Sequence, residues 1–423
     1  MSVSFWFAIA VVCVTVWALV KRYETRLVLL LAGFAMAIFA LDPMQAFTQF
    51  DKSMTRGSLI IAICSAMGFA AVVSLTKCDV HLVALLMRPL RRLGIFLLPA
   101  CMAVTSLCSL AIPSTAGLCA AVGPSMIPIL IRSGFKPAMA AAAVVGSVTA
   151  ALYNPGVSHN VFVAKLANME VMDLIRHFSG TTLAIIVLVI VGMTLICFIY
   201  RDYKKPEQGT VADAFETSGA SNLPKKVNFF YAIAPLVPVA ILLYVSIFTT
   251  MKMSVATAML IGSAYAVIVT RSDPQEVTRK FFDGMGTGYA KILGIIIAAG
   301  VFAAGLKAAG VIDVLVQALT NSNEWAKVGG ALGPYVLGIL TGSGDAATFA
   351  FNEAVTPHAP EFGMSIESLG YLAVYAGNFG RISSPLCGGL ILVAGIAAVN
   401  PLDIVKRTAP VMAAGLIMTY FIL

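Results

Sequence analysis

The sequence predicts an all-α polytopic membrane protein made of two inverted repeats. Three observations predict it: the composition, a series of apolar runs of helix length, and polar positions that recur between the two halves. Of the 423 residues, 59% are hydrophobic and only 11% are charged, whereas about 25% are charged in soluble proteins. So few charged side chains cannot cover the surface of a soluble chain of this length. The composition therefore excludes a secreted domain, a DNA-binding protein and a cytosolic enzyme.

Apolar runs follow one another along the whole chain, and about 20 helical residues are needed to cross the hydrocarbon core of a bilayer. The first run resembles a signal sequence, but no positive charge precedes it and Lys21-Arg22 follows it. We therefore expect it to be retained as the first span. The runs cover residues 3–20, 27–41, 58–76, 94–112, 117–131, 138–152, 157–167, 181–200, 229–248, 253–270, 285–306, 328–340, 346–355, 369–380, 386–399 and 409–423.

Four short polar interruptions lie inside this apolar sequence, at residues 113–116, 153–156, 341–345 and 381–385, and each contains Pro or Gly. Non-helical backbone at membrane depth is tolerated only where protein or a wet cavity satisfies its polar groups. A single break of this kind is an ordinary helix kink. Four breaks, paired between the halves, instead predict two re-entrant hairpins (94–131 and 328–355) and two broken helices (138–167 and 369–399).

The polar positions of the two halves match at one constant offset. Residues 163–176 resemble residues 393–406, and the same offset aligns Asn154-Pro155 with Ser384-Pro385 and Ser114-Thr115 with Gly344-Asp345. Chance similarity among apolar helices does not explain proline and polar positions in register, so we infer an internal repeat. We predict a first repeat over residues 1–200 with scaffold spans at 3–76, a cytoplasmic linker at 201–228, and a second repeat over 229–423 with scaffold spans at 229–306.

The distribution of basic residues predicts the orientation. Each repeat has five crossings, one of them discontinuous, and this odd number inverts the second repeat relative to the first. With the N-terminus outside, most of the 28 Lys and Arg residues fall in cytoplasmic loops, as the positive-inside rule requires. We expect both termini on the periplasmic side of a bacterial inner membrane. The net charge of +8 thus reflects orientation in the membrane, so we expect membrane lipid and no nucleic acid as a partner.

Inverted repeats with discontinuous helices at matching positions are typical of secondary transporters, which bind substrate at the midplane between the breaks. Each break exposes backbone N–H groups at a helix N-terminus, where an anion is favoured, and Ser and Thr hydroxyls add donors. The predicted substrate-binding residues are Ser114, Thr115, Asn154, Ser158, Thr341, Ser343, Gly344, Asn378, Arg381, Ser383 and Ser384. The predicted helix-breaking residues are Pro113, Pro155, Gly156 and Pro385.

Arg381 is a guanidinium within an apolar region, which is costly and therefore indicates function. Its planar group matches a carboxylate in a bidentate manner, so we expect it to bind a substrate carboxylate. The alternative is an ion pair with Asp345. Asp345 itself has three candidate roles: a proton-coupling site, a sodium ligand, or the counter-ion of Arg381. Glu353 follows two helical turns later and is the second candidate for the coupling ion.

Three other ionisable residues lie in or beside the breaks and spans. His159 follows the 153–156 break and is interpreted as a hydrogen-bonded histidine that packs between helices, with a proton relay as the alternative. Lys165 and Lys291 lie near predicted span ends, and we expect their side chains to extend toward the bilayer surface.

The sequence contains no motif of an enzyme or an ATP-driven pump. It has no G-x-x-x-x-G-K-[ST], no H-E-x-x-H and no G-x-S-x-G. The eight cysteines lie in or beside apolar runs without a C-x-x-C pair, so we interpret them as small apolar residues and expect no metal site. We therefore predict no enzymatic activity and no cofactor apart from a coupling ion. The alternative of a channel is less favoured, because a channel would not require paired hairpins.

Three segments resemble the DcuC family of anaerobic C4-dicarboxylate carriers, within a superfamily of ion transporters. They are Ser109 through Leu118, Thr341 through Phe351, and Asn378 through Pro385. The resemblance implies paired hairpins, a dimerising scaffold (hence a homodimer), elevator-like movement, and exchange or proton-linked transport of succinate, fumarate or malate. The hairpin tips depart from the Ser-Asn-Thr of sodium-coupled relatives, so H⁺ and Na⁺ both remain candidate coupling ions. The alternative function is a sodium-coupled carboxylate or amino-acid carrier of that superfamily.

Overall fold

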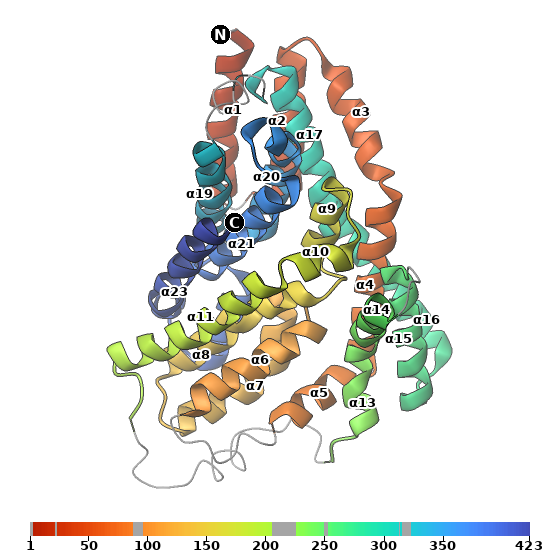
Figure 1. Cartoon of the computed structure of the whole chain (residues 1–423), viewed down its shortest axis with the longest axis vertical. Helices are drawn as coiled ribbons and strands as arrows, with labels where there is room; N and C mark the ends of the chain where they lie inside the picture. The colour runs from red at the N-terminus through yellow and green to blue at the C-terminus, as the bar shows by residue number, and fades with distance from the viewer. Residues whose placement is uncertain are drawn as a thin grey trace.

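The structure, a computed structural model, is helical almost throughout (Figure 1). It describes residues 3–21, 23–87, 96–204, 226–248, 253–312, 314 and 323–423. Within these ranges the one extended pairing is an isolated bridge between Phe135 and Tyr203. Arg22, the first two residues of the predicted hairpin 94–131 and residues 205–225 of the predicted linker lie outside the described residues.

The first half contains a helix–break–helix hairpin followed by a broken helix. The hairpin consists of α6 and α7, and the broken helix consists of α8, a 3₁₀ segment η3 and α9. The bounds are α1 Val3–Val20, α2 Thr25–Phe39, α3 Pro43–Met54, α4 Gly57–Leu75, α5 Cys78–Met87, α6 Leu97–Ala111, α7 Thr115–Arg132, α8 Pro137–Gly146, η3 Ser147–Tyr153, α9 Ser158–Leu166, α10 Val171–His177 and α11 Ser179–Ile199.

The second half contains the same kinds of element. Its hairpin consists of α19 and α20, and its broken helix of α21 and α22. The bounds are α13 Phe229–Ile233, η5 Ala234–Leu236, α14 Val237–Phe248, α15 Val255–Thr270, α16 Pro274–Gly288, the π-helical η6 Tyr289–Leu293, α17 Gly294–Ala308, α19 Asn323–Thr341, α20 Gly344–Ala354, η7 Thr356–Phe362, α21 Ile366–Ile382, α22 Gly388–Ala397 and α23 Pro401–Ile422. Figure 1 shows the second hairpin in the upper part of the view and the first hairpin in the lower part.

Two uninterrupted helices of the described residues, Ser179–Ile199 and Pro274–Ala308, are long and apolar enough to cross a bilayer. The number rises to five when each of three sharply bent helix pairs counts as one span. Several further apolar helices, among them Thr25–Phe39 and Val255–Thr270, are shorter. The chain is a multi-pass membrane protein whose apolar sequence is divided into many short helices.

The positions of the breaks differ in detail from those expected. The second hairpin interrupts only at Gly342 and Ser343, because α20 begins at Gly344. The helix α21 continues through Ile382, so Arg381 lies in its last turn rather than in the break. The sequence showed the loss of apolar character but not that the helical backbone extends into the polar stretch.

Two polar helices were not expected from the apolar runs. Helix α3 occupies the gap between the runs 27–41 and 58–76, and α16 extends the expected 285–306 span back to Pro274. Each begins with Pro at its first turn after an Asp, namely Asp42 and Asp273, a pattern that favours helix initiation. Both helices are amphipathic, and a search for apolar runs misses amphipathic helices.

The first residues of the predicted linker 201–228 pack against helices. Asp202 is fully buried and accepts hydrogen bonds from Arg407 of α23, Nε to Oδ2 at 2.6 Å and Nη2 to Oδ1 at 2.9 Å. Lys136 lies 3.1 Å from the same carboxylate. Because a buried carboxylate is stable only when it is paired, these contacts fix the chain after α11 against α8 and α23.

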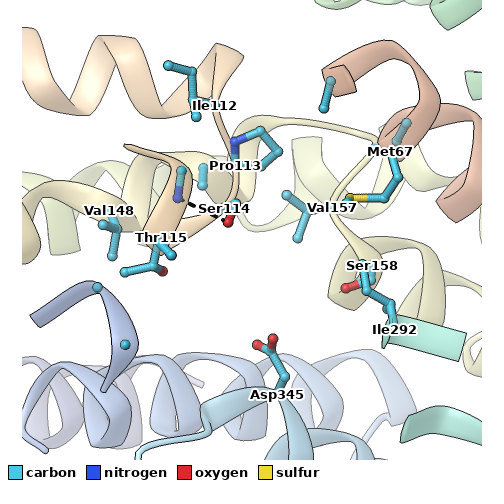
Figure 2. Close-up of a pocket in the computed structure, with 18 of the residues that line it drawn as sticks. Met67, Ile112, Pro113, Ser114, Thr115, Val148, Val157, Ser158, Ile292 and Asp345 are labelled. Atoms are coloured by element: carbon cyan, nitrogen blue, oxygen red, sulfur yellow. Dashed lines mark hydrogen bonds between the residues drawn. The ribbon is translucent and has the colours of Figure 1, made fainter. Parts of the chain in front are cut away.

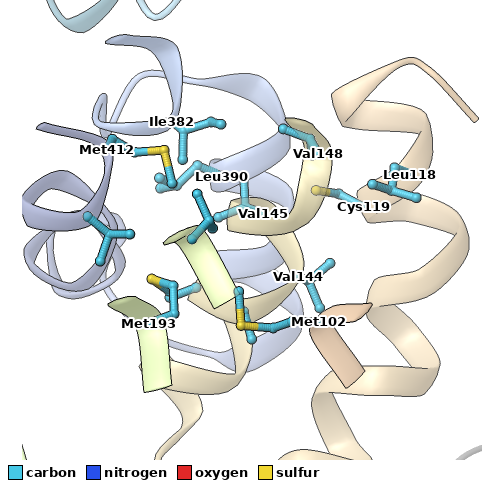
Figure 3. Packing of buried hydrophobic residues seen from close by; sticks show 14 of the residues in the cluster. Met102, Leu118, Cys119, Val144, Val145, Val148, Met193, Ile382, Leu390 and Met412 are labelled. Atoms are coloured by element: carbon cyan, nitrogen blue, oxygen red, sulfur yellow. The ribbon is translucent and has the colours of Figure 1, made fainter. Parts of the chain in front are cut away.

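The largest apolar core joins the first hairpin to both broken helices (Figure 3). Side chains such as Cys119 of α7, Val145 of α8, Leu390 of α22 and Met412 of α23 are buried in it. Helices of the second hairpin approach α21 through glycines: a Cβ on Gly380 would lie 2.3 Å from the carbonyl oxygen of Tyr335. Small residues allow such close helix contacts in membranes. This packing holds both breaks around a common space.

Candidate functional site

A cavity of about 940 Å³ lies where the tips of the two hairpins and the two broken helices meet. Its walls come from one face of α4, the first hairpin tip, the start of α9, the π-helical η6, the second hairpin tip and the α21–α22 break. Figure 2 shows Pro113, Ser114 and Thr115 on one side and the Asp345 carboxylate pointing into the space from another. The cavity therefore collects residues from both halves of the chain.

The first hairpin tip ends in a capped helix N-terminus. Ser114 is the N-cap of α7, and its Oγ accepts a hydrogen bond from the N–H of Gly117 at 3.3 Å. Thr115 is 8% exposed, and its buried Oγ1 has no hydrogen-bond partner among the described residues. Pro113 precedes the helix and supplies no N–H donor. The first tip thus presents an uncharged helix end with one unused hydroxyl to the cavity.

The second hairpin tip has the same construction with a charge added. Ser343 is the N-cap of α20, and its Oγ accepts a hydrogen bond from the N–H of Ala346 at 3.4 Å. Gly342 has φ +71°, and a Cβ there would lie 2.6 Å from the carbonyl carbon of Leu386, so the turn requires glycine. Asp345 follows in the first helical turn, where the helix dipole favours a negative charge.

The Asp345 carboxylate accepts hydrogen bonds from two side chains, the Arg381 guanidinium and the His159 ring. Its Oδ1 lies 3.2 Å from Arg381 Nη1 and 3.0 Å from His159 Nε2. The Nε and Nη2 groups of Arg381 donate to Asn378 Oδ1 at 3.0 and 2.7 Å. The Asp345 side chain is 44% exposed and that of Arg381 is 19% exposed. In this structure the Arg381 guanidinium thus forms the ion pair with Asp345 that was the alternative to substrate binding. The Asp345 carboxylate remains partly open to the cavity.

His159 packs against the second hairpin and also contacts the Asp345 carboxylate. Its ring stacks on Phe349 of α20, with centroids 4.6 Å apart, while Nε2 meets Asp345. Its Nδ1 is buried without a partner among the described residues. The packing role expected for His159 is therefore combined with a polar contact across the two halves, and the local sequence carries no signal for a contact this distant along the chain.

Most of the predicted site residues line this cavity. Those that do are Pro113, Ser114, Thr115, Gly156, Ser158, Ser343, Gly344, Asp345, Asn378 and Arg381. Those that do not are Asn154, Pro155, Thr341, Ser383, Ser384, Pro385 and Glu353. The second group lies in or beside the breaks, except for Glu353, which lies near the end of α20.

The polar side chains outside the cavity lining bond to the backbone of the breaks or to a neighbouring side chain. Asn154 donates to the carbonyl of Leu110 at 2.6 Å and accepts from the N–H of Gly156 at 2.8 Å. Ser384 Oγ donates to the carbonyl of Ile339 at 2.6 Å, and Thr341 Oγ1 donates to that of Leu337 at 2.7 Å. The Oγ of Ser383 lies 3.5 Å from the Tyr335 hydroxyl. The contacts of Asn154 and Ser384 satisfy backbone groups next to the breaks, where helical hydrogen bonds are missing.

Glu353 makes an ion pair far from the hairpin tip. Its carboxylate accepts hydrogen bonds from both Nη groups of Arg56, with the Nη1 contact at 2.9 Å, and from Gln49 Nε2 at 3.3 Å. Arg56 lies between α3 and α4, and Gln49 lies on α3. The second coupling-ion candidate is thus bound to the N-terminal helices in this structure.

The cavity also contains ionisable residues that the sequence did not assign to it. They are Lys77, Asp79 and Lys291, in addition to His159. Lys77 has a left-handed backbone conformation with φ +55°, which is uncommon outside glycine. Among the described residues no three His, Cys, Asp or Glu side chains gather as a candidate metal site.

Comparison with known proteins places this architecture among transporters. The family model of the DcuC C4-dicarboxylate anaerobic carriers matches residues 14–423. An anaerobic C4-dicarboxylate transporter DcuC of Escherichia coli K12 is 27% identical over 95% of this chain and 92% of its own. An uncharacterized transporter of Haemophilus influenzae is 40% identical over 62% of this chain and 96% of its own. The crystal structure of the YdaH transporter of Alcanivorax borkumensis shares the fold, with a TM-score of 0.61 at 15% identity, covering 89% of this chain and 86% of that one. Because the family model covers nearly the whole sequence, the chain belongs to the DcuC family of C4-dicarboxylate anaerobic carriers.

Proposed function

We propose that this protein is a secondary transporter of C4-dicarboxylates, such as succinate, fumarate and malate, in a bacterial inner membrane. The observation that carries the proposal is Arg381, a guanidinium that lines a largely apolar cavity together with two capped helix N-termini. A carboxylate in such a place gains a bidentate charge-assisted pair and donors from Ser114 and Ser343. The names of the bacterial relatives agree with this substrate class.

The Asp345 carboxylate indicates where a substrate carboxylate binds. It already occupies the position next to Arg381 and His159 that an anion would prefer. A substrate carboxylate would take over the Arg381 contact and leave Asp345 to bind a proton or a cation, because two adjacent carboxylates repel each other when both are ionised. This exchange of partners would couple dicarboxylate movement to a proton, or to Na⁺ in a sodium-coupled carrier.

We further infer the architecture by which the substrate moves. The two halves, residues 1–200 and 229–423, form inverted repeats joined by the linker 201–228. The crossings at 3–76 and 229–306 form a scaffold that dimerises, and the hairpins and broken helices move past it in an elevator-like step. The order of hairpin and broken helix, and the serine caps of α7 and α20, support the repeat.

Counterflow in proteoliposomes tests the substrate class. Vesicles loaded with unlabelled succinate should take up labelled succinate, fumarate or malate, whereas citrate, aspartate and arginine in the lumen should support little uptake. Runs with and without a Na⁺ or pH gradient separate exchange from coupled transport. Counterflow of aspartate or citrate but not succinate would overturn the C4-dicarboxylate assignment in favour of the amino-acid or other carboxylate carrier.

Two measurements test the architecture. In a background without native cysteines, Ser114→Cys and Ser343→Cys should be labelled by a membrane-impermeant reagent from opposite faces. Labelling of both from one face in every condition would contradict inverted repeats with periplasmic termini. Native mass spectrometry from lipid nanodiscs should give a dimer, and a monomer in both lipid and mild detergent would contradict the dimerising scaffold.

A further inference from the structure

Lys291 is a second cation of the cavity, and its backbone is unusual. It lies at the midpoint of the 35-residue helix Pro274–Ala308, within the π-helical stretch Tyr289–Leu293. π-Helical turns inside α-helices occur frequently at functional sites. We expected Lys291 near a span end with its side chain extended toward the bilayer surface. Instead the helix begins at Pro274, 17 residues before Lys291. The exposed side chain of Lys291 lines the cavity.

Lys291 and Asp345 line the same cavity, and the elements that carry Lys291 and His159 both pack against α4. A Cβ on Gly288 would lie 3.0 Å from Met67 Cβ, and a Cβ on Gly156 would lie 2.8 Å from Ala66 Cβ. The π-helical segment and the start of α9 therefore adjoin the same turn of α4. Lys291 follows Gly288 by three residues, as His159 follows Gly156. Figure 2 shows Ser158 and Ile292 close together at one side of the cavity, and the Asp345 carboxylate pointing into the space beside them.

The ammonium group of Lys291 has no counter-ion in the part of the chain that the structure describes. No salt bridge joins it to a described carboxylate, whereas Arg381 is paired with Asp345 and also bonded to Asn378. The charged residues that line the cavity are Lys77, Lys291 and Arg381 against Asp79 and Asp345. An unpaired ammonium group beside apolar walls favours the binding of an anion.

On the basis of the proposed function, we propose that Lys291 binds the second carboxylate of the dicarboxylate whose first carboxylate is held by Arg381. The two cations come from different elements of the cavity wall, Lys291 from the π-helical segment and Arg381 from the end of α21. A short diacid satisfies both at once, whereas a monocarboxylate of the same length leaves one cation without a partner. Lys291 is thus the residue that selects two charges over one.

Lys77 does not take part in this subsite, although it lines the same cavity. It lies ten residues beyond Met67, just after the end of α4, which corresponds to about 15 Å along a helix axis. Removal of its charge changes the potential of the cavity by the same unit of charge without touching the Asp345 end. Lys77→Gln is therefore a matched variant for Lys291→Gln.

The test compares a diacid with a monoacid of equal chain length on full-length protein in lipid nanodiscs. Binding of succinate and butyrate is measured for the wild type, Lys291→Gln, Lys291→Arg, Lys77→Gln and Lys165→Gln. Lys165 is exposed at the end of α9 and outside the cavity lining, so its variant serves as the unperturbed control. For Lys291→Gln we expect the succinate Kd to rise about 10- to 100-fold, as for loss of one hydrogen bond to a charged group.

The pattern across ligands and variants decides the proposal. Butyrate affinity should stay within about twofold in Lys291→Gln, Lys291→Arg should recover most succinate binding, and Lys77→Gln should have a much smaller effect. An unchanged succinate Kd in Lys291→Gln, an equal loss for butyrate, or an equal loss in Lys77→Gln would overturn the assignment of Lys291 alone. A wild-type protein that binds no dicarboxylate would overturn the proposed function, and this assignment with it.

Discussion

The tips of the two hairpins present the same kind of helix end to the cavity but carry different charge. Ser114 caps α7 and Ser343 caps α20, each by accepting the N–H three residues ahead. The first tip continues with Thr115, and the second with Gly344 and Asp345. The backbone that favours anions is thus present twice, while the ionisable groups at a tip are confined to the second half, beside Arg381. The two tips are thus alike in backbone and differ in charge, so the charged residues of the second tip set its chemistry apart from that of the first.

The largest effect expected from this difference is that of Arg381→Ala. Loss of a buried charge-assisted pair costs about 2–5 kcal/mol, a loss of affinity of roughly thirtyfold to several thousandfold. Arg381→Lys keeps the charge but loses the planar fork, so it should weaken binding less. Binding of succinate by titration calorimetry measures both. Arg176→Ala, which removes an exposed arginine paired with Asp173, should leave binding unchanged. A folded Arg381→Ala protein with wild-type affinity would show that Arg381 is only a partner of Asp345.

A smaller effect of opposite sign is expected for Asp345→Asn. Asparagine retains an oxygen acceptor for His159 but no longer competes with substrate for Arg381. A hydrogen bond to a charged group contributes about 1.5–3 kcal/mol, so dicarboxylate binding should tighten by roughly tenfold or more. Turnover in exchange assays should fall, because the substrate is released less readily. Weaker binding in this variant would mean that Asp345 itself helps to hold the substrate or its coupling ion.

Glycine substitutions compare how tightly the two tips are packed. A Cβ on Gly344 would lie 2.3 Å from the carbonyl oxygen of Gly377, whereas one on Gly117 would lie 3.3 Å from Ser114 Cβ. Gly344→Ala should therefore destabilise the protein by about 1–3 kcal/mol through overpacking, and Gly117→Ala should cost less. Thermal unfolding in lipid measures the difference. Gly395→Ala, with no atom within 4 Å of the added Cβ, is the control, and equal shifts at 117 and 344 would contradict the comparison.

The smallest effects are expected for the two caps. Replacing an N-cap serine by alanine costs about 1 kcal/mol of stability, and Ser114→Ala and Ser343→Ala should lower the melting temperature by similar amounts. If the tips are alike in backbone, neither variant should change stability more than the other. A large excess loss in Ser343→Ala would show that the cap of α20 also holds Asp345 in place.

The sequence was informative wherever the signal was local. Proline, glycine and serine in apolar surroundings predicted the interruptions near 113, 155 and 342, and the arginine at 381 stood out because guanidinium groups are rare there. Contacts between distant residues had no local signal. His159 meets Asp345 across 186 positions and Asp202 meets Arg407 across 205. Helices α3 and α16 were missed because their polar faces lower the number of apolar residues in each run. The prediction for Lys291 was wrong because its helix was expected to begin at residue 285, whereas it begins at Pro274.

The pair between Glu353 and Arg56 bears on the elevator-like movement proposed above. Glu353 belongs to the second hairpin, and Arg56 to the junction of α3 and α4. Any displacement of that hairpin along α4 must first separate these two side chains, of which the Glu353 carboxylate is only 7% exposed. The resting arrangement then has an activation barrier of its own, separate from the substrate. Because the Glu353 carboxylate is shielded from solvent while Arg56 is 27% exposed, added salt should change the rate of that step less than it changes an interaction between two exposed charges.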